Sequence, residues 1–97
     1  MSLSVKWLPE AEITYALVLE YLKENWTPKE VIAFIDRTDE VIGQIAKQPK
    51  SYIYSKKKDA YRAVITRQTS LYYRVNSKEI ELLVFWDNRQ DLNKLIL

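Results

Sequence analysis

The fold of this chain is decided by residues 60–91, which read AYRAVITRQTSLYYRVNSKEIELLVFWDNRQD. Runs of β-branched and aromatic residues fill this stretch, and short polar breaks at 67–70 and 76–78 separate them. Breaks this short are typical of hairpins, so consecutive strands should pair antiparallel and form a meander. With one more run upstream, we predict four strands, at residues 52–54, 61–66, 71–75 and 80–86.

The last predicted strand carries apolar residues on both faces. Because side chains alternate along a strand, strict alternation divides them into two sets. One set is Ile80, Leu82, Val84 and Trp86, and the other is Glu81, Leu83, Phe85 and Asp87. We expect one face of the sheet to receive the helices.

Two helices are predicted upstream of the meander. Residues 4–8 suit a first strand, and Pro9 suits the first position of a helix. Apolar residues then recur at three- and four-residue steps, the period of a helix with a broad buried face. They are Ala11, Ile13, Tyr15, Leu17, Val18, Tyr21, Leu22 and Trp26.

A second helix start follows at once. Thr27 can cap it, Pro28 takes its first position, and Glu30 has the spacing of a capping box. The helical period continues to about Lys47 and ends before Pro49, so two antiparallel helices meet at a tight corner. The apolar residues of this second helix are Val31, Phe34, Ile35, Val41, Ile42 and Ile45.

These elements predict one α+β domain over residues 1–97. Its order is an N-terminal strand, a two-helix antiparallel hairpin, the antiparallel β-meander and a short C-terminal helical tail. We expect one or two helical turns within 89–97, with Leu92, Leu95 and Ile96 packing back. The chain is 47% hydrophobic with one glycine, which excludes disorder.

Composition excludes several kinds of chemistry. Without cysteine there is no disulfide framework or thiol nucleophile, and without histidine there is no serine–histidine catalysis or histidine-bound zinc. We therefore expect no metal and no cofactor. No apolar run is long enough to span a bilayer and no signal peptide is visible, so the expected location is the cytoplasm, with no membrane partner.

Charge is unevenly distributed along the chain. Residues 47–78 hold nine basic residues against Asp59 alone, whereas residues 1–46 have a net charge of −4. A basic sheet attracts polyanions or an acidic protein segment. The alternative is a solvated sheet whose lysines, Lys57 among them, keep an edge strand from pairing with other chains. The tyrosines of the strands also have two readings, as stacking surfaces for bases or as core and cross-strand pairs.

Any catalysis would have to use arginine, lysine, tyrosine or carboxylate groups. Arg62, Arg67 and Arg74 stand on successive strands and would stabilise a phosphate if they converged. RNA cleavage would also need a tyrosine or lysine with a lowered pKa to take the 2′-hydroxyl proton. The carboxylates of the helices are explained by a solvated face, so we assign no catalytic residue.

The order of elements, together with several local strings, resembles the RelE/ParE toxin superfamily. The strings are residues 5–7 with 10–11, 45–49, 60–62, 71–75 and 80–91. The closing WDNRQD, residues 86–91, is similar to the end of the ParE and plasmid-stabilisation branch. The resemblance covers nearly the whole chain and implies a toxin of a type II toxin–antitoxin system.

Two branches of this superfamily imply different activities. The RelE branch cuts messenger RNA on the ribosome, and Arg62 and Arg89 match two of its basic positions. Val64 and Ser70 replace two other basic residues, and Leu95 stands near the expected tyrosine. The resemblance therefore favours a ParE-like inhibitor of DNA gyrase.

The alternatives are a metal-independent, ribosome-dependent endoribonuclease and a non-toxic module that binds acidic partners. The resemblance implies a cognate antitoxin, whose tail lays apolar side chains beside the helices, and no small-molecule substrate. The residues expected to bind the target or a nucleic acid are Arg62, Arg67, Arg74, Arg89, Lys56, Lys57 and Lys58.

Overall fold

The computed structural model describes residues 3–97, so the first two residues of the predicted domain lie outside it. It confirms the predicted α+β architecture, with shifts of one or two residues at element ends. The elements are β1 (Ser4–Trp7), α1 (Pro9–Asn25), α2 (Pro28–Lys47), β2 (Ile53–Ser55), β3 (Ala60–Thr66), β4 (Thr69–Val75), β5 (Glu79–Asp87) and the short 3₁₀ helix η1 (Leu92–Lys94).

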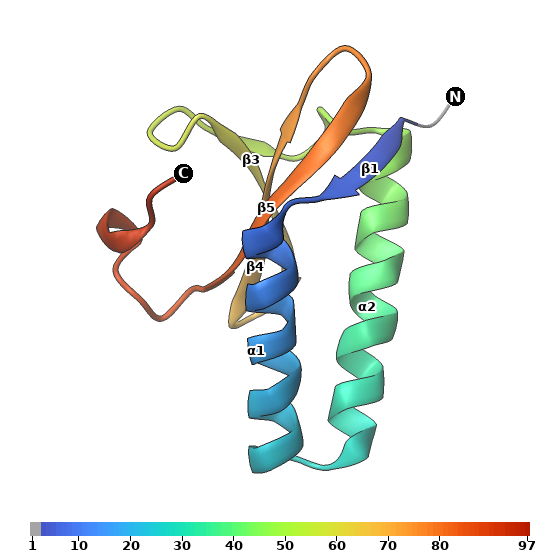
Figure 1. Cartoon of the computed structure of the whole chain (residues 1–97), viewed down its shortest axis with the longest axis vertical. Coiled ribbons are helices and arrows are strands. Elements are labelled where there is room, and N and C mark those ends of the chain that lie inside the picture. Colours follow the sequence, from blue (N-terminus) through green and yellow to red (C-terminus); the bar gives the residue numbers. More distant parts are fainter. Residues whose placement is uncertain (1–2) are drawn as a thin grey trace.

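The five strands form one mixed sheet in the order β1-β5-β4-β3-β2. The meander β2 to β5 is antiparallel throughout, as predicted, while β1 pairs in parallel with β5. The helical hairpin is the crossover that parallel pairing requires. Both helices cover the same face of the sheet (Figure 1).

The main core lies between this face and the helices. Phe34, Val41 and Ile45 of α2 are buried in it together with Leu82 and Phe85 of β5. Aromatic rings extend the contact between α1 and the sheet: the centroids of Tyr15 and Phe85 are 5.1 Å apart, as are those of Tyr15 and Trp7. These tilted and edge-to-face contacts contribute beyond the apolar area they bury.

Local sequence signals start the helices where expected. Pro9 and Pro28 occupy first helical positions, and the Glu30 carboxylate accepts a hydrogen bond from the backbone N–H of Thr27 at 3.1 Å. Thr14 ties α1 to the sheet, because its hydroxyl oxygen accepts a hydrogen bond from the N–H of Phe85 at 2.9 Å. The capping box predicted for α2 is confirmed.

A β-bulge in β5 makes the predicted alternation wrong. Tyr73 pairs with Leu82 and Tyr72 with Val84, so Leu83 is the extra residue. Beyond it the faces are exchanged: Phe85 joins the core under the helices, and the other face takes Val84 and Trp86. Residue-by-residue alternation cannot anticipate an inserted residue.

The other face of the sheet carries a second, smaller cluster. Ala60, Tyr72, Leu83 and Val84 are buried there beneath Leu95 of the C-terminal segment. The predicted tail is thus present as a single 3₁₀ turn, and Leu92 and Leu95 pack back. The expectation for Ile96 is wrong, because this side chain is 90% exposed.

Candidate functional site

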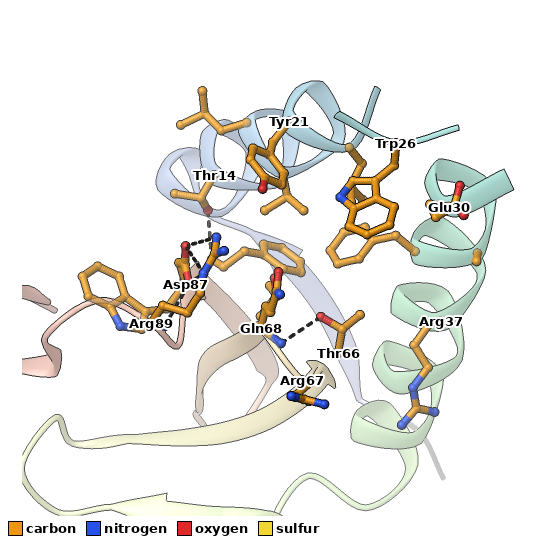
Figure 2. A pocket seen from close by; sticks show the side chains of 18 of the residues that line it. Thr14, Tyr21, Trp26, Glu30, Arg37, Thr66, Arg67, Gln68, Asp87 and Arg89 are labelled. Atoms are coloured by element: carbon orange, nitrogen blue, oxygen red, sulfur yellow. Dashed lines mark hydrogen bonds and ion pairs between the residues drawn. The ribbon is translucent and has the colours of Figure 1, made fainter. Parts of the chain in front are cut away.

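A groove of about 950 Å³ lies where the two helices meet the end of the sheet. Its walls come from α1, the first half of α2, the turn between β3 and β4, and the residues that leave β5 (Figure 2). Its large apolar lining residues are Leu17, Val18, Tyr21, Leu22, Trp26, Phe34, Phe85 and Trp86. A groove with such a lining suits an amphipathic segment that inserts apolar side chains.

The α1 wall leaves large apolar side chains uncovered. Leu17 is 58% exposed, Tyr21 44% and Trp26 57%, and Ile13 continues the row one turn earlier at 54%. The predicted broad buried face of α1 is therefore wrong for these four residues. The half that packs on the core consists of Ala11, Tyr15, Val18, Leu19 and Leu22. Helical periodicity registers both rows but cannot separate a core face from an interaction face.

One end of the groove is closed by an arginine clamp. Arg89 Nη2 donates to Asp87 Oδ2 at 2.8 Å and Arg89 Nε donates to Asp87 Oδ1 at 3.0 Å. The guanidinium carbon also lies 6.0 Å from the centroid of the Tyr21 ring. The hydrogen bonds from Arg89 lower the pKa of Asp87. The bulge at Leu83 allows this clamp, because it places Asp87 on the helix side of β5.

The opposite rim carries two more arginines, on α2 and on the β3–β4 turn (Figure 2). Arg37 pairs with Glu40 at 2.8 Å and donates to the carbonyl of Ile65 at 3.3 Å. The Arg67 side chain makes no hydrogen bond or ion pair within residues 3–97. An apolar floor edged by guanidinium groups is complementary to a segment that is apolar on one side and acidic on the other.

The structure divides the seven basic residues predicted to bind a target between two sides of the molecule. Arg67 and Arg89 line the groove beside the helices. The other five belong to the opposite face of the sheet and to the β2–β3 turn, and they are Lys56, Lys57, Lys58, Arg62 and Arg74. The hypothesis that Arg62, Arg67 and Arg74 converge on one phosphate is therefore wrong.

Several of these five residues donate hydrogen bonds to other parts of the same chain. Arg74 donates from Nε to the carbonyl of Asp59 at 2.7 Å and from Nη2 to the carbonyl of Lys58 at 3.3 Å. These bonds support a turn in which Asp59 has a positive φ of 52°. Lys57 and Lys58 donate to the C-terminal segment. Arg62 donates to the hydroxyl of Ser70 at 3.2 Å and forms no ion pair within residues 3–97.

The tyrosines of the strands form packed pairs, which favours the structural reading of them. The ring centroids of Tyr61 and Tyr73 are 5.4 Å apart, and those of Tyr54 and Tyr61 are 5.1 Å apart. Tyr73 is fully buried and donates to the carbonyl of Pro49 at 2.6 Å. Tyr72 is 2% exposed beneath Leu95.

Three tyrosines outside the groove have raised pKa values. Burial raises the pKa of Tyr73 and of Tyr15, and the hydrogen bond to Asp59 raises the pKa of Tyr54, which disfavours the tyrosinate that a general base would need. Within residues 3–97, no three carboxylates gather as a metal site would require.

No helix within residues 3–97 is long and apolar enough to cross a membrane. Neither a protein-family model nor a curated protein matches the chain by sequence.

Solved structures do match it. A protein of the chromosomal ParDE toxin–antitoxin system from P. aeruginosa is 17% identical, with a TM-score of 0.74 over 89% of this chain and 96% of that one. YoeB from Staphylococcus aureus is 16% identical, with a TM-score of 0.58 over 87% and 94%. A copper-bound mutant toxin from Helicobacter pylori is 18% identical, with a TM-score of 0.61 over 90% and 96%. The resemblance expected from the sequence is thus confirmed in three dimensions, and the chain has the fold of the RelE/ParE toxins.

Proposed function

We propose that this protein is the toxin of a type II toxin–antitoxin system and that it acts as a ParE-like inhibitor of DNA gyrase in the cytoplasm. The observation that carries the proposal is the likeness to the ParDE-system protein, with a TM-score of 0.74 against 0.58 for YoeB. The chemistry agrees with it, because the groove offers arginines and apolar surface, and the pKa values of Tyr15, Tyr54 and Tyr73 are raised rather than lowered.

The groove supports the antitoxin half of the proposal. An antitoxin tail would lay apolar side chains against Leu17, Tyr21 and Trp26 and direct carboxylates to Arg37 and Arg67. The exposed α1 row leaves such a tail substantial apolar area to cover, and burial of apolar area drives association. The tail would lose conformational entropy on folding against the toxin, whereas the groove, being already formed, needs little reorganisation of the toxin itself.

Purified toxin and gyrase provide the direct test. Toxin in molar excess should stop the supercoiling of relaxed plasmid, and the antitoxin should restore it. Growth arrest on induction that is relieved by co-expression of the antitoxin would support the toxin assignment independently. Full supercoiling activity in the presence of a toxin that arrests growth would exclude gyrase and retain the toxin.

A ribosome-dependent endoribonuclease is the second candidate, and Arg62 is the observation that favours it. This guanidinium lies on the sheet face away from the helices without an ion-pair partner in residues 3–97. Its surroundings count against catalysis: Val64 adds no charge, Ser70 is fully buried, and a buried leucine, Leu95, stands near the position where the resemblance expects a tyrosine. Primer extension after induction should show codon-linked cuts, absent in Arg62→Ala, if this candidate is correct.

The third candidate is a non-toxic module that binds an acidic partner. The side chains of Arg67 and Arg62 form no ion pair within residues 3–97 and would serve such a partner as well as a toxin's target. Harmless overexpression of the protein without its neighbour would favour this candidate over both toxins.

A further inference from the structure

The exposed side of α1 carries apolar and acidic side chains next to one another. Ile13, Leu17 and Tyr21 follow each other at four-residue steps, so they form one row along the helix, and each is between 44% and 58% exposed. Three exposed carboxylates lie three residues from a member of this row and form no ion pair within residues 3–97, namely Glu10, Glu20 and Glu24. This side of α1 is therefore both apolar and acidic.

The groove beside the row offers the opposite charge. The side chain of Arg67 makes no hydrogen bond or ion pair within residues 3–97, and the ion pair between Arg37 and Glu40 is exposed to solvent. Figure 2 shows Tyr21 and Trp26 along one side of the groove and Arg37 and Arg67 along the other. One continuous surface thus contains an apolar row, free carboxylates and accessible guanidinium groups.

A surface of this kind is complementary to a second copy of itself. In a dimer with a two-fold axis both partners use the same patch, so any patch that holds two complementary halves can pair with its own copy. Here α1 supplies the carboxylates and the opposite rim of the groove supplies the guanidinium groups. The two-fold axis would form each such contact twice, and the apolar rows would cover one another at the centre.

The remaining basic surface is unsuited to a second copy. The β2–β3 turn and the strands beside it present Lys56, Lys57, Lys58, Arg62 and Arg74, so two copies that met there would repel each other. The helical hairpin is accessible by comparison, because the corner between α1 and α2 extends beyond the sheet (Figure 1). Charge and shape therefore both favour the groove side for self-association.

We propose that two copies of this chain form a two-fold symmetric dimer in which α1 of each copy lies against the groove of the other. Leu17 and Tyr21 of one copy contact the apolar lining of the second, and Glu20 and Glu24 face its arginines. One helix face buries less than the standard area of about 800 Å² per partner, so the dimer should dissociate on dilution. The inference concerns this chain alone and holds whether or not an antitoxin also uses the groove.

Sedimentation of the full chain without any other protein, in a dilution series through the micromolar range, tests the dimer. Wild type should show a monomer–dimer equilibrium. Leu17→Asp should raise its dissociation constant at least about tenfold, because the symmetry removes the apolar contact twice. The matched control Ile32→Asp changes a residue that is 59% exposed outside the groove and should behave as wild type. A monomer at every concentration, or equal losses in both variants, would overturn the proposal.

A charge exchange tests which groups meet. One variant combines Glu20→Lys with Glu24→Lys, and the other carries Arg67→Glu; each places like charges opposite one another in a dimer of its own kind and should stay largely monomeric. Both should melt close to wild type, because the substituted side chains are exposed. In a mixture of the two variants every contact again joins opposite charges, so a mixed dimer of about wild-type affinity should form. A mixture that stays monomeric, or variants that dimerise alone, would contradict the proposed arrangement.

Discussion

Leu17 offers the sharpest test of the groove as the antitoxin site, because α2 supplies a matched residue elsewhere. Leu17 is 58% exposed and lines the groove, while Ile32 is 59% exposed and does not line it. Replacing each by aspartate adds the same charge at a helical position. The two variants should therefore differ only in their affinity for a partner bound in the groove.

The magnitude follows from the area that remains to be covered. Full burial of a leucine side chain contributes about 1.5–3 kcal/mol, so covering the exposed 58% of Leu17 contributes about 1–1.7 kcal/mol. Leaving a carboxylate desolvated in the covered groove adds about 1–3 kcal/mol. Together these predict that Leu17→Asp weakens antitoxin binding by at least about 2 kcal/mol, or about 30-fold in Kd.

Calorimetric titration with the antitoxin, expected as a small acidic protein encoded beside this chain, measures the effect. Ile32→Asp should change Kd by less than about twofold, and both variants should melt close to wild type, since exposed substitutions usually cost within about 0.5 kcal/mol. Equal losses for the two variants, or none for Leu17→Asp, would refute the assignment of the groove.

Three further outcomes are expected. Because Arg89 lowers the pKa of Asp87, the pair stabilises the fold above the unfolded carboxyl pKa of about 4; the melting difference between wild type and Asp87→Asn should be full at neutral pH and shrink as pH falls below that value. Leu95→Ala should cost about 2–4 kcal/mol in urea unfolding, whereas Ile96→Ala, 90% exposed in the native chain, should be nearly neutral. Arg62→Ala should leave growth arrest intact if gyrase is the target, and abolish it if messenger RNA is cut.

Elements set by local chemistry were predictable from the sequence. Pro9, Pro28 and the capping box at Thr27 determine where the helices begin, and the short polar breaks determine the antiparallel meander. Each of these signals acts within a few residues, so no tertiary contact is needed to read it.

The site was less predictable, because it depends on which apolar surface the fold leaves uncovered. Leu17 and Tyr21 have the same helical spacing as Val18 and Leu22, and only the position of the sheet decides which pair is buried. Charge counting grouped Arg67 with Arg74 in one basic segment, although the fold places them on different sides. The net charge of a segment shows that the segment is basic, but it does not show that its basic residues share one face of the fold.

The extra residue at Leu83 links the two surfaces of the molecule. Without the bulge, alternation would place Asp87 on the other face of the sheet, away from the groove and from Tyr21. Trp86 would then point toward the helices instead of joining the cluster beneath Leu95. One inserted residue therefore shapes both the groove and the covered face. The bulge shifts the pairing of β5 with β4 at one position, and every residue after it, up to Asp87, takes its face from that shift. Deleting one residue between Ile80 and Asp87 would therefore exchange the faces of the residues that follow.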